Sequence, residues 1–423
     1  MILGTTLRIL RATLAELKIY RPLLRYLNNI KTRRFKAARR ITFIVYQSAV
    51  WKSSGVYKAL EANPDVDVSI TIMPIIDNGI MLVDDWLRTT KYFQDKGYNV
   101  DTTLSDLKTS RLTEYFSDID TVVFSDCWNL SQSNFYYYVL FFKDCVYVPY
   151  SHQVSQYGNF QAQYNQLLHN FVRSIYAPHQ YERDIFEVHS HIKNDNVKSL
   201  GYPGVSHFIE ACDSDDGGVV VFPNDPWLSF VNKSAKRLIW APHHSINWTE
   251  RRYSNFIEMH EKMLDYVDLY KSEINFIFKP HPMLKQILYN NWGIEKTDEY
   301  YKRWQGKSNC KVEEGEYGAL FFYSDALIHD CGSFVAEYIY LDKVHAFVHS
   351  SENIYKSFNY FGQQCLRSAI KIMTDKDLED FIRNFSIKGL IQEKYSKTEY
   401  IDELKSRSRN CDTTIAQDIL NGS

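Results

Sequence analysis

Three short polar segments in the second half of the chain each follow a run of apolar residues. They are "APHHS" (241–245), "KPHP" (279–282) and "HDCGS" (329–333). The apolar runs before them are predicted to be strands. In an open parallel sheet, ligands bind at the carboxyl ends of the strands. We therefore expect the three segments to meet at one edge of one sheet and to form a binding site.

The residue types in two of these segments suit a diphosphate. Lys279 and His281 are two residues apart, so both side chains point to one side of an extended chain. A cation beside an imidazole can stabilise the negative charge that grows on a leaving phosphate. Gly332 and Ser333 open a predicted helix, whose free N–H groups attract an anion and whose serine can cap the helix and donate to a phosphate oxygen. Glu337, one turn later, shares a helix face with Ser333 and could bind ribose hydroxyls.

The adjacent residues His243 and His244 are expected to have different roles. Neighbouring side chains point in opposite directions along an extended chain. One ring is therefore predicted to contact the phosphate of the ligand and the other to contact the backbone nearby. A zinc site is the alternative, with ligands drawn from His243 or His244, His281, His329 and Asp330. We favour a site without metal, because no HExxH motif is present and Lys279 would lie close to the ion.

The elements that would position these residues alternate along the chain. From Ile41 onward, strand-like runs alternate with helical patterns, which predicts parallel sheets covered by helices. The expected strands of the first half are 41–46, 66–74, 120–126, 145–152 and 172–179, and those of the second half lie in 236–245, 273–282, 324–330 and 344–350. No GxGxxG motif follows any of them, which argues against an oxidoreductase that binds a dinucleotide. No cofactor is predicted.

The length of 423 residues and the break in this alternation predict two domains. The segments 213–218 and 222–227 carry acids, glycine and proline without apolar periodicity, which is typical of a connection. The fold class expected is α/β, with two Rossmann-like domains facing a cleft, an arrangement called GT-B. The predicted parts are a basic helical segment at 1–40, a first Rossmann-like domain at 41–212, a linker at 213–236 and a second Rossmann-like domain at 237–423, whose final helices could pack back on the first domain.

The first 40 residues are strongly basic. They hold eight arginines, three lysines and one acid, Glu16, so their net charge is +10, whereas the whole chain has a net charge of −2. Leucines recur at helical spacing from Leu3 to Leu17, which indicates a basic amphipathic helix. No stretch reaches the roughly 18 apolar residues of a membrane-spanning helix. We expect this helix to lie on an anionic membrane surface. The alternative is packing on the protein's own body.

Two further features bound the functional class. The basic charge does not continue into the body of the chain, so nucleic acid is not an expected partner. The seven cysteines are scattered and include no CxxC pair, which favours buried thiols in a reducing compartment over a disulfide framework. We expect a cytoplasmic protein that is peripheral on a membrane surface.

The three polar segments resemble motifs of the CDP-glycerol glycerophosphotransferase family, the teichoic-acid polymerases and their relatives. That family has "APT", "KLHP" and "TDYSS…FDY" segments in the same order, and they correspond here to 241–245, 279–282 and "HDCGSFVAEY" (329–338). "GYPG" (201–204) is similar to the start of the family's "GxPRND". The family's "WHGTP" is absent, and "VPYSHQ" (148–153) occupies the comparable place. The resemblance covers roughly residues 145–350.

The resemblance implies a GT-B enzyme in which the first domain (41–212) binds the acceptor and the second domain (237–423) binds the nucleotide of a CDP-activated donor. It also implies a place on the inner face of a bacterial membrane. It implies phosphate contacts for His281 and Ser333, and ribose contact or orientation for Asp330 and Glu337. By the same comparison, His152 is assigned as the base that removes the acceptor proton, since an imidazole titrates near neutral pH.

The predicted function is transfer of glycerol phosphate, or a related polyol phosphate, from a CDP-activated donor to a hydroxyl of a cell-surface polysaccharide, such as teichoic acid or capsule, or of a lipid-linked glycan. CMP would be released. One alternative is a GT-B glycosyltransferase that uses a nucleotide sugar. Another is a non-catalytic, membrane-associated protein of glycan assembly.

Overall fold

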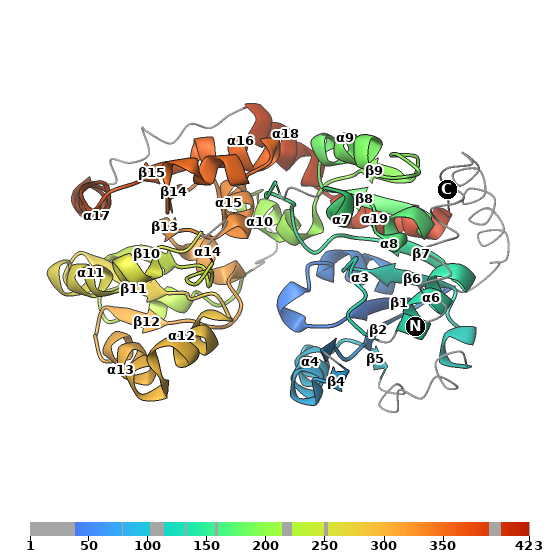
Figure 1. Cartoon of the computed structure of the whole chain (residues 1–423), viewed down its shortest axis with the longest axis horizontal. Helices are drawn as coiled ribbons and strands as arrows, with labels where there is room; N and C mark the ends of the chain where they lie inside the picture. Colours follow the sequence, from blue (N-terminus) through green and yellow to red (C-terminus); the bar gives the residue numbers. More distant parts are fainter. Residues whose placement is uncertain are drawn as a thin grey trace. The chain divides into compact units, whose positions relative to one another are not determined.

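The computed structural model describes residues 39–77, 79–101, 114–131, 133–156, 160–213, 222–248, 253–388 and 399–422. The chain forms two compact units (Figure 1). The first comprises the described residues within 39–152, 160–206 and 406–422, and the second comprises those within 153–156 and 207–405. The basic segment predicted at 1–40 lies outside the described residues except for its last two, and the predicted linker at 213–236 lies partly outside them.

The first unit is built on a sheet of seven parallel strands in the order β5-β2-β1-β6-β7-β8-β9. The strands are β1 (Arg39–Val45), β2 (Val66–Ile72), β5 (Val100–Asp101), β6 (Thr121–Phe124), β7 (Asp144–Tyr147), β8 (Ser174–Ala177) and β9 (Val197–Ser199), with a separate hairpin of β3 (Ile76–Asp77) and β4 (Ile80–Met81). The helices are η1 (Ser48–Val50), α3 (Ser54–Glu61), α4 (Val83–Asp95), α6 (Ser133–Phe142), α7 (Phe160–Tyr164), α8 (Leu167–Phe171), α9 (Gln180–His189), α10 (Pro203–Asp213) and α19 (Cys411–Asn421). The helix α10 continues into the second unit.

The second unit has a sheet of six parallel strands in the order β12-β11-β10-β13-β14-β15. The strands are β10 (Lys236–Ala241), β11 (Ile274–Phe278), β12 (Cys310–Val312), β13 (Ala326–His329), β14 (Val344–Val348) and β15 (Ile370–Ile372). The helices are η4 (Pro226–Ser229), α11 (Phe256–Leu269), α12 (Leu284–Trp292), α13 (Ile294–Gln305), α14 (Gly318–Tyr323), α15 (Gly332–Tyr338), η5 (Ile339–Leu341), η6 (Glu352–Ser357), α16 (Tyr360–Ser368), α17 (Asp375–Lys388) and α18 (Glu399–Ser408), whose last residues belong to the first unit.

Both sheets reverse their strand order at a central pair of strands. In the first, the chain runs outward from β1 through β2 and then returns to place β6 on the other side of β1. In the second, β10 and β13 form the corresponding pair. Such reversal points leave a crevice at the carboxyl ends of the two strands, where α/β proteins bind ligands. The prediction of an α/β fold with two Rossmann-like domains is confirmed.

The apolar character of the strands explains why they are buried on both faces. Along β1, Ile44 contributes to one hydrophobic cluster, whereas Ile41, Phe43 and Val45 contribute to another on the opposite face of the sheet. Strands buried on both faces read as nearly continuous apolar runs, and this made β1 and the other central strands recognisable. The edge strands β5, β9, β12 and β15 are only two or three residues long, and the sequence patterns did not predict them.

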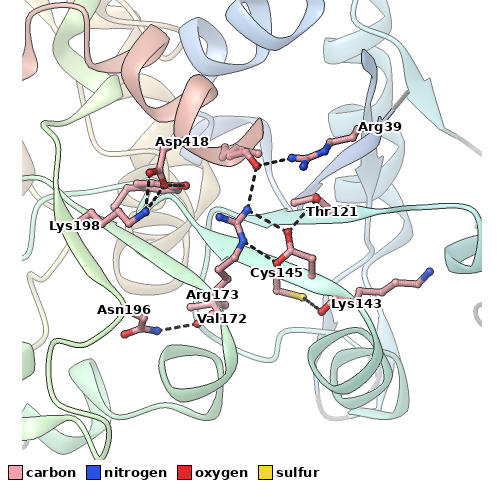
Figure 2. Close-up of polar contacts among 12 residues, drawn as sticks. Arg39, Thr121, Lys143, Cys145, Val172, Arg173, Asn196, Lys198 and Asp418 are labelled. Atoms are coloured by element: carbon pink, nitrogen blue, oxygen red, sulfur yellow. Dashed lines mark hydrogen bonds and ion pairs between the residues drawn. The ribbon is translucent and has the colours of Figure 1, made fainter. Parts of the chain in front are cut away.

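The C-terminal helix α19 is held to the rest of the first unit by a partly buried polar network (Figure 2). Arg173 binds Asp144 through two hydrogen bonds of 2.9 and 3.1 Å, and the same guanidinium donates to the carbonyl of Ile419 in α19 at 3.1 Å. Asp418 accepts hydrogen bonds from Lys198 at 2.7 and 2.9 Å and from the hydroxyl of Tyr176 at 2.8 Å. These contacts attach the last helix to strands β7, β8 and β9.

We expect Tyr176→Phe to lower the free energy of unfolding by about 1.5 kcal/mol, because the hydroxyl donates to a charged carboxylate. Urea denaturation followed by circular dichroism measures this. Tyr46→Phe is the matched control, since the buried Tyr46 hydroxyl has no hydrogen-bond partner among the described residues. An equal fall in the free energy of unfolding for the two variants would contradict a stabilising hydrogen bond from Tyr176 to Asp418.

Two global features complete the fold. All seven cysteines are free thiols, and only Cys212 is exposed. Among the described helices, none is long and apolar enough to cross a membrane.

Candidate functional site

The three polar segments meet at the carboxyl edge of the second sheet. They follow β10, β11 and β13, and these strands are neighbours in the sheet. The backbone N–H of His243, after β10, donates to Oδ1 of Asp330, after β13, at 2.5 Å. This hydrogen bond joins the two loops across the point where the strand order reverses, so the segments lie where the fold predicts a ligand.

Three imidazole rings cluster at this edge. The ring centroids lie 4.2 Å apart for His243 and His244, 4.1 Å for His244 and His281, and 5.2 Å for His243 and His281. The expectation that His243 and His244 point in opposite directions is therefore wrong. Pro242 follows the last residue of β10, and the chain bends at His244, so the alternation of an extended strand does not apply.

The surrounding hydrogen bonds fix the proton of the His243 ring. Its Nδ1 accepts the backbone N–H of Ser245 at 3.2 Å and lies 2.9 Å from the Ser245 hydroxyl. That hydroxyl oxygen accepts the N–H groups of Tyr253 and Ser254, which leaves its own hydrogen to donate to Nδ1. Because a backbone N–H can only donate, Nδ1 carries no proton, and the proton of the neutral ring is on Nε2. Nε2 of His243 is therefore a hydrogen-bond donor.

His281 is held in the same way. Its Nδ1 accepts the backbone N–H of Met283 at 3.1 Å, so its Nε2 also carries the proton. The nearby side chain of Lys279 is buried, with 4% of its surface exposed. Two Nε2–H donors and an ammonium group at one edge match the oxygen atoms of a phosphate.

Burial keeps these rings neutral. It lowers the pKa of His243 to about 2, with smaller contributions from His244 and His281. It lowers the pKa of His281 to about 3, and the charges of His244 and Lys279 act in the same direction. Burial also lowers the pKa of His244. At neutral pH the cluster therefore offers N–H donors, and Lys279 supplies the positive charge.

The His243, His244 and His281 cluster is also where a metal ion would be expected in the described part of the chain, since potential ligand atoms of the three residues lie within 4.8 Å of one another. A metal binds the lone pair of a neutral imidazole nitrogen. In His243 and His281 that lone pair is on Nδ1, where it already accepts a backbone N–H. The hydrogen bonds therefore favour an anion over a metal here, and a site without metal stays our prediction.

The Asp330 carboxylate joins two loops of the site through hydrogen bonds to the backbone of one of them. It is buried and accepts the backbone N–H groups of His243 at 2.5 Å and Asn255 at 2.6 Å. Burial raises the pKa of Asp330 to about 7, against the effect of these two hydrogen bonds. Since both oxygens are engaged by the backbone, the geometry supports loop orientation over ribose contact.

The helix α15 carries the remaining predicted residues of this unit. Its N-cap residue is Cys331 and its first residue is Gly332, so Ser333 lies inside the helix and the expectation that Ser333 caps it is wrong. The half-buried Ser333 hydroxyl lies 3.2 Å from Sγ of Cys331. Glu337 is buried and accepts a hydrogen bond from the Tyr317 hydroxyl. Ribose contact by Glu337 and phosphate contact by Ser333 stay predictions.

His152 lies in the first unit, five residues after β7. Its ring is buried, stacks on His179 with centroids 5.7 Å apart, and lies 4.3 Å from the ring of Tyr202. Burial, and to a lesser extent the charge of His179, holds the pKa of His152 well below its usual value. The ring is therefore neutral and can accept a proton, but burial weakens it as a base.

The sequence analysis missed the residues that hold the histidines in place. Ser245 is part of the quoted segment "APHHS" but was given no role, and it fixes the His243 ring. Asn255 begins the turn into α11, and its amide donates to the carbonyl oxygens of Tyr253 and Val348. For Ser245, its position two residues after a histidine was an available signal. For Asn255 there was none, because its contact with Val348 spans 93 residues of the chain.

The free energy of unfolding is expected to fall as the pH drops from 7 to 5. The folded pKa values of His243 and His281 lie below the unfolded value of about 6.5, so the unfolded state takes up protons first. The raised pKa of Asp330 acts in the opposite sense, since its contribution is lost as the pH rises through about 7. The wild type should lose free energy of unfolding between pH 7 and pH 5, and His281→Gln should lose about 1 to 2 kcal/mol less over the same range. Urea denaturation at the two pH values measures the difference. Identical losses would contradict these pKa directions.

No protein-family model and no curated protein matches this sequence. Solved structures are similar in fold. A variant of the wall teichoic acid polymerase TagF is 13% identical, with 99% of this chain and 97% of that chain covered and a TM-score of 0.60. The same polymerase soaked with CDPG is 12% identical, with the same coverage and a TM-score of 0.57. The UDP-GlcNAc 2-epimerase from Neisseria meningitidis bound to UDP-GlcNAc is 12% identical, with 91% of this chain and 100% of that chain covered and a TM-score of 0.57. At these identities the likeness shows a shared fold, and the resemblance to the teichoic-acid polymerases is confirmed at that level.

Proposed function

We propose that this protein transfers glycerol phosphate, or a related polyol phosphate, from a CDP-activated donor to a hydroxyl of a surface polysaccharide or lipid-linked glycan. The observation that supports the proposal is the set of N–H donors and one ammonium group at the reversal point of the second sheet. The Nε2–H groups of His243 and His281 and the ammonium of Lys279 come from two neighbouring loops. This arrangement suits a diphosphate, and the fold is shared with a polymerase whose structure was determined after soaking with CDPG.

In the proposed reaction, the acceptor oxygen attacks the phosphorus that carries the glycerol. The bond from that phosphorus to the bridging oxygen breaks, and its electron pair leaves with CMP. His243, His281 and Lys279 would stabilise the charge that develops on the diphosphate. His152 is the proposed acceptor of the hydroxyl proton, and its neutral state leaves a lone pair for this purpose.

A second candidate is transfer of a sugar from a nucleotide sugar. It is favoured by the fold likeness to an epimerase that binds UDP-GlcNAc. The two reactions differ in their products, because polyol phosphate transfer releases CMP and sugar transfer from a UDP-sugar releases UDP.

A thermal-shift screen with CDP, CMP, UDP and CDP-glycerol tests the proposal. A ligand that binds only the folded state raises the free energy of unfolding, by about 2.7 kcal/mol at a concentration 100 times its Kd, and therefore raises the melting temperature. We expect CDP and CDP-glycerol to raise it more than UDP, and chromatography to detect CMP once an acceptor is added. Preferential stabilisation by UDP, with UDP released from a UDP-sugar, would support the second candidate. Tight CDP binding with no turnover on any acceptor would support a non-catalytic role.

We also propose that residues 1–40 bind an anionic membrane surface, because that segment carries a net charge of +10. Sedimentation with vesicles that contain phosphatidylglycerol should recover the full chain, and a chain lacking residues 1–38 should stay in the supernatant. Equal sedimentation of both would contradict this.

A further inference from the structure

The first unit has its own group of buried polar side chains at the point where its strand order reverses. Tyr46 directly follows β1, and Ser125 and Asp126 directly follow β6, its neighbour in the sheet. The exposed fractions of these residues are 3%, 4% and 8%. None of them was singled out by the sequence motifs. Their position in this sheet corresponds to that of His243 and Asp330 in the other.

Two of these side chains have no hydrogen-bond partner among the described residues. The hydroxyl of Tyr46 and the hydroxyl of Ser125 are both buried and both unpaired. Buried polar groups are nearly always paired, and leaving one unpaired destabilises the folded state. A ligand that forms hydrogen bonds with the Tyr46 and Ser125 hydroxyls would explain why they have no partner in the described part of the chain.

Asp126 adds an acceptor beside them. Its Oδ1 accepts the backbone N–H of Trp128 at 2.8 Å, and its Oδ2 accepts no hydrogen bond from the described residues. Burial raises the pKa of Asp126 to about 6, so the carboxylate is mostly ionised at neutral pH. Burial raises the pKa values of Tyr46 and Cys127, and the negative charge of Asp126 adds to the rise in both.

We infer that Tyr46, Ser125 and Asp126 form a binding subsite for a hydroxyl group of a polyol or sugar. A hydroxyl both donates and accepts, so it can donate to Oδ2 of Asp126 and accept from Tyr46 or Ser125. The carboxylate disfavours a phosphate at this position. This inference rests on the proposed function, because it assigns the subsite to the hydroxyl-bearing acceptor.

The test uses the full chain and saturation-transfer difference NMR with two neutral probes, ribitol and glucose. We expect a signal from at least one probe, and the probe that gives it identifies polyol or sugar as the class. Tyr46→Phe and Asp126→Asn should each reduce that signal at least fivefold. Tyr46→Phe should keep or raise the melting temperature, because it removes an unpaired buried hydroxyl.

Tyr176→Phe is the matched control, since Tyr176 is a buried tyrosine of the same unit whose hydroxyl is paired with Asp418. It should lower the melting temperature and leave the NMR signal unchanged. No signal from either probe, or a signal that Tyr46→Phe and Asp126→Asn leave intact, would overturn the inference. CDP binding is measured separately on the same samples. A lack of CDP binding with an intact probe signal would instead reject the proposed donor and keep the hydroxyl subsite.

Discussion

Replacing His281 with alanine is expected to lower turnover of CDP-glycerol by about 100- to 1,000-fold, the usual effect of removing one preorganised donor to a developing charge. The Met283 N–H holds the His281 ring with its Nε2 proton available, and the ring lies beside His244 and near Lys279. The variant should fold, because the ring is only partly buried. Release of CMP in the presence of an acceptor measures the effect.

His260→Ala is the matched control for this variant. His260 belongs to the same unit but lies on α11, where its ring contacts the carbonyl of Ile257 and the ring of Phe256. We expect its turnover to stay within about twofold of the wild type. Unchanged turnover in His281→Ala, with a wild-type melting temperature, would remove His281 from the site.

Asp330→Ala is expected to lower the free energy of unfolding by about 3 kcal/mol and to weaken CDP binding. The substitution leaves the buried N–H groups of His243 and Asn255 without their carboxylate, and hydrogen bonds to a charged group contribute about 1.5 to 3 kcal/mol each. Burial of the ionised carboxylate, which raises the pKa of Asp330, offsets part of the combined contribution of these two hydrogen bonds. Urea denaturation and a CDP titration measure the two effects.

Asp377→Ala provides the comparison for Asp330→Ala. The Asp377 carboxylate also accepts two backbone N–H groups, those of Met373 and Thr374, but it does so near the surface, at the start of α17. We expect Asp377→Ala to lower the free energy of unfolding by about 1 kcal/mol, the usual effect of removing a helix cap, and to leave CDP binding unchanged. Equal losses of stability and of CDP binding in the two variants would contradict the positioning role of Asp330.

The sequence carried enough information to find the sheet edge but not the arrangement of the side chains on it. Strands such as β10 and β11 are buried on both faces, so their apolar runs and the polar segments after them were visible. The pairing of His243 with His244 was mispredicted, because it depends on a bend after Pro242 that strand periodicity does not describe.

Long-range contacts explain most of what the sequence could not supply. Asp330 reads as a ribose ligand in the motif, yet it binds the backbone of residues 75 and 87 positions away. Tyr46 and Asp126 belong to no recognisable motif, and they become notable only because β1 and β6 are neighbours in the sheet. The short edge strands β9 and β15 had too few residues to show any periodicity.

A crystal structure of the protein with CDP tests the central claim most directly. The account predicts diphosphate oxygens within hydrogen-bonding distance of Nε2 of His243 and of His281, with the ammonium of Lys279 beside them. A nucleotide whose phosphates lie away from these three side chains would contradict it.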